Sequence, residues 1–212
     1  MEIYSSEEQQ VEAIKRFWKQ NGTAIIAGVV LGLAGLYGFR YYQAQQVTQL
    51  EAQSAQYAQL IEKLSEDGAD KTAWLAAAQT FIEANKSSNY AVLTALLAAK
   101  EAVFTNNLAA AEQQLTWVLS ATKSTELIAV ATLRLARVQA EQGNTSAALA
   151  TLNAELPVSF LAQQQELRGD VLLQTGDEAK AKAAYQAALA AGEAEKNPLL
   201  QVKLNELAHV AN

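Results

Sequence analysis

The most informative pattern of this chain is Gly176-Asp-Glu-Ala-Lys-Ala181-Lys-Ala-Ala-Tyr185-Gln-Ala-Ala188-Leu189. A glycine opens it, alanine follows at plus five, an aromatic residue at plus nine, and Ala-Leu at plus twelve and thirteen. Alanine at fixed intervals leaves room for a neighbouring helix, and a large side chain one turn later fills the space between helices. The stretch therefore predicts a helix that packs tightly against others.

The same pattern occurs twice earlier in the chain. Gly143, 33 residues before Gly176, is followed by Ala148, Leu152 and Leu156 in the same register. A looser copy starts at Asn106, 37 residues before Gly143, and continues with Ala111, Leu115 and Leu119. These steps bracket the period of about 34 residues that is typical of tetratricopeptide repeats, in which helix pairs stack into a solenoid. Alanine-rich helices would seldom match all these positions by chance, so we predict an all-α, tetratricopeptide-like helical-repeat solenoid.

The repeat assigns a packing role to each of its positions. Gly169, seven residues before Gly176, matches the other small position of such a repeat, where the two helices of a unit touch. Glycine or asparagine at the turn accepts the left-handed backbone that ends a helix, and Asn144 or Asp177 can cap the next one. The predicted packing residues are Gly143, Ala148, Leu152, Gly169, Gly176, Ala181, Tyr185 and Ala188.

Helices are expected along the whole chain, because alanine and leucine dominate and only two prolines occur. A helix from about Gln9 is predicted to continue, with a break or bend, to about Ser65, and another to cover Lys71–Ala84. Further helices are predicted at 89–104, 107–120, 125–142, 145–155, 160–175 and 178–191. Asn197 is predicted to cap a final helix with Pro198 at its first position, which closes the stack.

Near its start the chain runs from Gln20 to Phe39 without a charged residue. At about 1.5 Å per residue a helix of that length spans roughly 30 Å, the thickness of a bilayer's hydrocarbon core. A cleaved signal peptide and a buried core helix are the alternatives. The long acidic start and the bulky exit at Phe39-Arg40-Tyr41-Tyr42 disfavour cleavage, and core helices are rarely so long and free of charge. We predict a single membrane anchor flanked by interfacial aromatic residues.

Basic residues beside the anchor predict its orientation. Lys15, Arg16 and Lys19 precede it, whereas Arg40 alone follows it until Lys63. Because basic residues concentrate on the cytoplasmic side, we expect a cytoplasmic segment at 1–19, a transmembrane helix at 20–42 and a tetratricopeptide-like domain at 43–212 outside the cytoplasm. In a bacterium this is an inner-membrane protein with its body in the periplasm.

Small residues follow one stripe of the anchor at steps of four or three. Such a stripe lets another membrane helix approach closely, although glycine is also common in membrane helices in general. The predicted membrane helix-packing residues are Ala24, Gly28, Gly32, Gly35 and Gly38.

Composition excludes several classes of function. A net charge of −6 and a pI of about 4.9 disfavour nucleic-acid binding, which depends on neutralising phosphates. The chain has no cysteine and no glycine-rich phosphate loop, and its only histidine, His209, has no ligand cluster around it in sequence. Capping or solvation explains the aspartates near turns, which are Asp67, Asp70, Asp170 and Asp177. We therefore expect no enzyme, no cofactor, no metal and no small-molecule substrate.

Three arginines mark a candidate partner-binding face. Arg134, Arg137 and Arg168 lie on the predicted first helices of two repeats, and stacked helix pairs present those helices on a concave surface. Arginine can hold a carboxylate or a peptide backbone, but ion pairing within the protein is the alternative. The apolar groove between repeats could instead accept a short hydrophobic or amphipathic segment.

Several blocks of the sequence resemble one known family. Met1-Glu-Ile-Tyr4, Gln10–Phe17, the glycine-rich anchor, Leu133-Arg-Leu-Ala-Arg-Val-Gln139 and Leu167-Arg-Gly-Asp170 are similar to the ancillary SecYEG translocon subunits of Gram-negative bacteria (YfgM type). The resemblance covers essentially the whole chain. It implies a bitopic inner-membrane protein with a periplasmic repeat domain that associates with the SecYEG translocon and with a membrane-anchored periplasmic chaperone of the PpiD type. It implies no catalytic residue.

Two classes of non-catalytic function remain at this stage. The first is an ancillary translocon component that assists the folding of exported proteins through protein–protein interaction. The second is a general cell-envelope scaffold for wall-synthesis or division machinery. If the topology were inverted, the body would be a cytoplasm-facing adaptor.

Overall fold

The computed structural model of the protein describes residues 7–193 and 198–209 and divides into two compact units, Met1–Ala52 and Gln53–Asn212. Within the described ranges the regular structure is helical and includes no strand, as the sequence predicts. Helix α1 (Glu7–Ser65) contributes to both units. The apolar anchor and the stretch that follows it are thus parts of one helix.

The first unit consists of the part of α1 that carries the predicted anchor. Its large apolar side chains are exposed over the charge-free stretch, including Leu31 at 73% and Leu33 at 61%. Among the described residues, this is the one helix that is long and apolar enough to cross a membrane. A soluble core would bury these side chains, so their exposure along a helix of this length fits a membrane-spanning segment.

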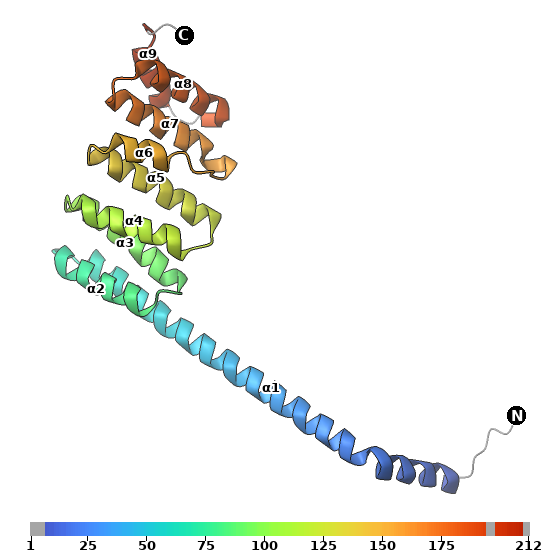
Figure 1. Ribbon diagram of the computed structural model, residues 1–212. Helices are drawn as coiled ribbons and strands as arrows, with labels where there is room; N and C mark the ends of the chain where they lie inside the picture. Colours follow the sequence, from blue (N-terminus) through green and yellow to red (C-terminus); the bar gives the residue numbers. More distant parts are fainter. Residues whose placement is uncertain (1–6, 194–197, 210–212) are drawn as a thin grey trace, which may run out of the picture. The chain divides into compact units, whose positions relative to one another are not determined.

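The second unit is a stack of paired helices that follow one another in chain order (Figure 1). Its first four helices after the end of α1 are α2 (Lys71–Ala84), α3 (Asn89–Phe104), α4 (Leu108–Ala121) and α5 (Thr125–Glu141). They are followed by α6 (Thr145–Thr151), α7 (Val158–Gln174), α8 (Glu178–Ala188) and α9 (Pro198–Glu206). The helix pairs α3–α4, α5–α6 and α7–α8 are the three sequence repeats.

The same kind of turn joins the two helices of each pair. Asn106, Gly143 and Gly176 all adopt the left-handed region, with φ of 58°, 78° and 79°. The next residue in each turn donates its N–H to a carbonyl five residues back, at 2.7 to 3.1 Å: Asn107 to Ala102, Asn144 to Gln139, and Asp177 to Leu172. This is the hydrogen bond of a Schellman motif, which satisfies a free carbonyl at the helix end. The turn prediction is confirmed.

The residue that makes this backbone bond also starts the second helix of the pair. The side chains of Asn107, Asn144 and Asp177 accept hydrogen bonds from the N–H three residues later, at 3.2 to 3.3 Å. An N-cap of this kind contributes roughly 1 kcal/mol to a helix. Two adjacent residues therefore end one helix and begin the next, which makes each repeat recognisable in sequence.

The repeat positions lie in the core of the second unit. Ala111, Ala148 and Ala181 at plus five are fully buried, and Leu115, Leu152 and Tyr185 at plus nine are buried to within 1%. These side chains belong to successive core clusters along the stack. At the start of this unit, the indole N–H of Trp74 on α2 donates to the carbonyl of Leu60 at 2.7 Å and ties α2 to the end of α1.

Two helices end three or four residues earlier than the sequence predicts, whereas α5 and α7 end within one residue of the predicted position. Helix α6 stops at Thr151 rather than near residue 155, because Pro157 disfavours helix just before it and other side chains take the free carbonyls at Leu152 and Ala154. The α-helical part of α8 ends at Ala188, and the chain continues as a π-helical turn, Leu189–Glu193, with φ of 107° at Gly192. Helix α9 begins at Pro198 as predicted, and its predicted cap, Asn197, lies outside the described residues.

Candidate partner-binding site

Helix α5 lies in the middle of the stack and exposes two arginines. Its sequence buries the residues on either side of them, Leu133, Leu135, Ala136 and Val138, against both neighbouring pairs. Arg134 and Arg137 are three residues apart, so they lie on one face of the helix, and both are exposed. The periodicity of α5 therefore presents a pair of guanidinium groups between two repeats.

A groove lies on one side of this pair, between α3–α4 and α5, and is called the α3–α5 groove below. Its volume is about 530 Å³, and its apolar lining includes Val103, Phe104, Leu108 and Val138. Arg134, Arg137, Lys100 and Glu141 also line it. Phe104 is 68% exposed and Val103 is 42% exposed, so apolar surface is open to water at the end of α3.

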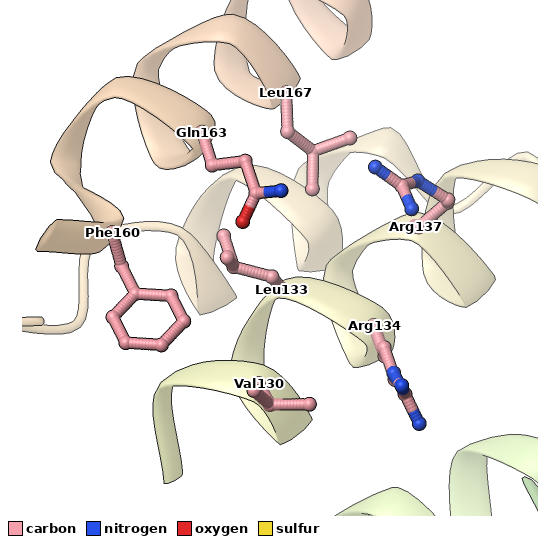
Figure 2. A pocket seen from close by; sticks show the side chains of 7 residues that line it. All are labelled: Val130, Leu133, Arg134, Arg137, Phe160, Gln163 and Leu167. Carbon is pink, nitrogen blue, oxygen red and sulfur yellow. The ribbon is translucent and has the colours of Figure 1, made fainter. Parts of the chain in front are cut away.

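A second groove lies on the other side of the pair, between α5 and α7, and is called the α5–α7 groove below. It has a volume of about 280 Å³ and is lined by Val130, Leu133, Phe160, Gln163 and Leu167 together with the same two arginines. In Figure 2, Arg137 reaches toward Leu167 on α7, whereas Arg134 extends away from α7. One arginine pair thus borders two grooves.

The charges around the grooves are unequally compensated. Lys71 and Lys100 pair with the buried carboxylate of Glu101 at 2.8 and 3.6 Å, and both ammonium groups lie 5.4 Å from the ring centroid of Phe104. In the part of the chain that the structure describes, Arg134 and Arg137 make neither an ion pair nor a hydrogen bond. Their charges are therefore available to a ligand, in a chain whose net charge is −6.

Arg168 does not belong with this pair, which corrects the grouping of three arginines. It is half-buried, and its guanidinium donates to the carbonyl of Leu152 at 2.6 Å and to Oδ1 of Asn153 at 3.0 Å. These acceptors lie at the end of α6, where helical carbonyls have no partner of their own. Arg168 fastens α6 to α7, and the candidate face reduces to Arg134 and Arg137.

Two buried glutamines that sequence reasoning missed support the same region. Gln139 on α5 donates to Oε1 of Glu112 at 3.1 Å and accepts from the hydroxyl of Thr151 at 2.7 Å, so it links α4, α5 and α6. Gln164 on α7 donates to the carbonyls of Leu152 and Ala154 at 2.9 and 2.8 Å. Both glutamines occupy positions that the helical period assigns to the core, and a polar residue there is the signal that could have identified them.

The predicted packing residues lie at the helix crossings. Gly169 on α7 faces the ring of Tyr185 on α8, and Ala148, Leu152, Ala181 and Ala188 are fully buried. Gly143 and Gly176 occupy the turns described above. A Cβ built at Gly28, Gly32, Gly35 or Gly38 in the anchor meets nothing within 4 Å, and Ala24 is exposed, so the small stripe faces outward in the described structure.

A polar cluster at the end of the stack joins α7, α8 and α9. Lys203 contacts Oδ1 of Asp170 at 2.6 Å and Oε1 of Glu166 at 2.8 Å, and the hydroxyl of Tyr185 donates to Oδ1 of Asp170 at 2.8 Å. Burial and the Asp170 carboxylate raise the pKa of Tyr185. Burial alone would lower the pKa of Lys203, but its bonds to Asp170 and Glu166 outweigh this and raise it. Asp170 is therefore an ion-pair partner rather than a solvated group.

The remaining ionisable groups singled out in the sequence lie at helix ends. Asp70 and Asp177 cap α2 and α8, and the hydrogen bonds from Lys180 lower the pKa of Asp177. His209 is exposed and lies 3.1 Å from the carboxylate of Glu178. Among the described residues, no three His, Cys, Asp or Glu side chains form a group that could hold a metal ion.

Comparison with known proteins agrees with this architecture. Residues 15–209 match the tetratricopeptide repeat-like domain family. A Haemophilus influenzae protein named ancillary SecYEG translocon subunit is 35% identical over 201 residues, which cover 95% of this chain and 97% of that protein. The Escherichia coli protein of the same name is 37% identical over 208 residues, which cover 98% of this chain and 99% of that protein. The crystal structure of a tetratricopeptide repeat protein from Parabacteroides merdae covers 76% of this chain and 59% of its own, at 17% identity and a TM-score of 0.48. Because the domain match and the two ancillary SecYEG translocon subunits extend over nearly the whole chain, the chain belongs to the tetratricopeptide repeat-like domain family and to the family of ancillary SecYEG translocon subunits.

Proposed function

We propose that this protein is a non-catalytic ancillary subunit of the Sec translocon in the bacterial inner membrane. The observation that carries the proposal is the near full-length relationship to proteins named for that role, in a chain that joins a membrane-length exposed helix to a repeat body. Tetratricopeptide-like stacks bind other proteins through extended surfaces rather than performing chemistry. The anchor would hold such a surface beside the channel.

In this proposal residues 1–19 are cytoplasmic, 20–42 cross the membrane, and the body at 43–212 lies in the periplasm. Its support is the bias of basic residues, with Lys15, Arg16 and Lys19 before the span and Arg40 after it. An alkaline phosphatase domain fused after Asn212 should be active, and the same domain inserted after Gln10 of the otherwise full-length chain should be inactive. The reverse pattern would make the body a cytoplasmic adaptor.

The body is proposed to recruit a membrane-anchored periplasmic chaperone of the PpiD type and so to assist the folding of exported proteins. The supporting feature is the pair of grooves around Arg134 and Arg137, which present apolar surface and unpaired positive charge together. A carboxylate or a peptide backbone on a partner could satisfy these guanidinium groups.

Crosslinking from the anchor tests the translocon assignment. A photoreactive amino acid replaces Leu31, Leu33 or Leu36 in turn, since these side chains are exposed and face lipid or a neighbour. Crosslinks to translocon subunits are the expected result. A probe at exposed Lys86 in the body is the control for crosslinking from a position outside the anchor. Crosslinks to wall-synthesis or division proteins in their place would favour the envelope-scaffold alternative.

The small stripe of the anchor, Ala24, Gly28, Gly32, Gly35 and Gly38, is proposed to pack against another membrane helix. Close approach needs small side chains, so Gly28→Leu with Gly32→Leu should lower the yield of the anchor crosslinks. Val30→Leu, on the opposite side of the helix, is the matched control and should leave the yield unchanged. Equal yields from all variants would remove this stripe as a contact.

A further inference from the structure

The two grooves beside α5 are separated by the width of one helix. An α-helix with its side chains is about 10 Å across, and packed helix axes lie about 8–10 Å apart. A ligand that uses both grooves must therefore cross α5 and pass over the exposed pair Arg134 and Arg137. The crossing point is cationic. The α3–α5 groove on one side of it is mainly apolar, and the α5–α7 groove on the other side combines Leu133, Phe160 and Leu167 with the amide of Gln163.

A peptide in an extended conformation has the spacing that this arrangement of two grooves and one arginine pair requires. Alternate side chains of an extended chain point to the same side, and each residue advances about 3.3 Å. Residues two positions before and two positions after a central residue are then about 13 Å apart and face the protein together. That separation places one side chain in each groove while the central side chain lies over the arginines.

The sizes of the grooves favour side chains over a whole helix. Volumes of about 280 and 530 Å³ accept a few apolar side chains each, and the two grooves lie on opposite sides of α5, whereas a docked helix needs one continuous channel about 10 Å wide. The lining supplies the matching surface: Leu133, Phe160 and Leu167 in the smaller groove, and Val103, Leu108 and Val138 in the larger one.

Charge defines the central residue. Arg134 and Arg137 have no partner among the described residues, and a carboxylate, the anionic group of unmodified protein side chains, accepts paired hydrogen bonds from a guanidinium. Glu141, one turn after Arg137 on α5, also lines the α3–α5 groove and would repel a second acid there, so the flanking residue on that side must be apolar. We propose that the α5 face binds an extended segment of a partner protein with the pattern apolar-x-acidic-x-apolar, its acid held by Arg134 and Arg137.

This inference deepens the proposed function, because it names the chemistry of the partner that the repeat body would recruit. It can be tested without any partner protein. The full-length protein in detergent micelles is titrated into a fluorescently labelled peptide, acetyl-Ser-Leu-Ser-Glu-Ser-Leu-Ser-amide, and fluorescence anisotropy reports binding. Two matched peptides replace either the glutamate by glutamine or both leucines by serine.

The expected result is saturable binding of the Glu peptide, weakened about tenfold or more in each matched peptide. Arg134→Gln with Arg137→Gln should weaken the Glu peptide by a similar factor and leave the Gln peptide unchanged. Val103→Ser, at an exposed position of the α3–α5 groove, should weaken both leucine-containing peptides. Lys86→Gln with Lys123→Gln removes the same charge elsewhere, at exposed positions outside both grooves, and should have little effect.

Three outcomes would overturn the inference: no binding of the Glu peptide at about 1 mM, equal binding of the Glu and Gln peptides, or full binding by the double arginine variant. None of them touches the translocon assignment, which the anchor crosslinks decide. Conversely, specific peptide binding by a protein whose anchor crosslinks only to wall machinery would keep this site and remove the proposed function.

Discussion

The aromatic ring of Tyr185 on α8 lies where the side chain of any residue other than glycine would project from position 169 of α7. A Cβ built on Gly169 is 2.3 Å from Cε1 and 2.4 Å from Cδ1 of that ring. Tyr185 itself is fully buried, so the ring cannot turn outward without opening the core cluster around Ala181 and Ala188. Glycine at position 169 is what allows α7 and α8 to pack at this distance.

Gly169→Ala should destabilise the repeat body by about 1–3 kcal/mol, the usual cost of overpacking a filled core. A loss of stability would identify the contact, because alanine in a helix interior otherwise stabilises a protein by roughly 0.5–1 kcal/mol relative to glycine. Thermal unfolding of the full-length protein in micelles, followed by circular dichroism, measures the change. Gln174→Ala, at an exposed position of the same helix, is the control. A higher melting temperature for Gly169→Ala would contradict the contact.

Lys203→Met should loosen the last helix. The substitution leaves the carboxylates of Glu166 and Asp170 without the ammonium that lies 2.8 and 2.6 Å away, and these side chains are only 16% and 35% exposed. Removing one partner of a partly buried pair costs about 1–3 kcal/mol. Hydrogen exchange of α9 should accelerate, while that of α3 and α4 stays the same. Lys180→Met is the matched control, because its pair with Asp177 is 2.6 Å long but 74% exposed on the lysine side. An equal effect of both variants would refute the role of Lys203.

Alkaline pH should destabilise the protein partly through Tyr185. Burial and Asp170 raise the pKa of its phenol in the folded state above the ordinary value of 10.0, so the folded protein retains a proton that the unfolded chain releases. The stabilisation that comes from the protonated phenol of Tyr185 is fully present below about pH 10 and is lost as the pH rises above that value. The raised pKa of Lys203 acts in the same direction.

Urea unfolding at a series of pH values between about 8 and 11 tests this effect. Tyr185→Phe should lose about 1 kcal/mol at pH 8, because the hydrogen bond to Asp170 is gone. Between about pH 8 and pH 11, the free energy of unfolding of the Tyr185→Phe variant should fall less than that of the unsubstituted protein. Parallel curves for the two proteins would show that Tyr185 does not contribute to the alkaline loss.

Substitutions of Arg168 and of Arg134 should differ in their effect on the stability of the protein. Arg168→Gln removes the donor to the Leu152 carbonyl and should cost about 1–3 kcal/mol, because α6 then loses a tie to α7. Arg134→Gln removes an exposed side chain that has no partner among the described residues. It should change the free energy of unfolding by no more than about 0.5 kcal/mol. Melting temperatures of both variants measure the difference. Equal stability of the two would argue against the structural role of Arg168.

Much of the repeat could be predicted because its signals are local. The left-handed turn at Gly143 and the cap at Asn144 are adjacent in sequence, and Ala148 and Leu152 follow within two turns of helix. The helical period then assigns those positions to the core without knowledge of their neighbours. The early end of α6 has one local cause, Pro157, and one that the sequence does not reveal: Gln164 and Arg168 on α7 bind the carbonyl of Leu152 at the end of α6.

The candidate site was only partly predictable for the same reason. Arg134, Arg137 and Arg168 look alike in sequence, each on the first helix of a repeat. Their difference depends on what the facing helix offers: Arg168 meets the open end of α6, whereas the other two meet grooves. The contacts of Lys203 with Asp170 and Glu166 join residues 33 and 37 apart in sequence, beyond the reach of any helical period.

The membrane-length apolar helix, the alternation of helices and the register of the repeats follow from the amino-acid order alone, because composition and short-range backbone geometry specify them. Packing between helices sets which of the three arginines remain unpaired, where apolar surface stays open beside them, and how α9 is held against α7 and α8. Those properties arise from side chains on different helices, whose positions are set only when the cores of successive repeats pack together.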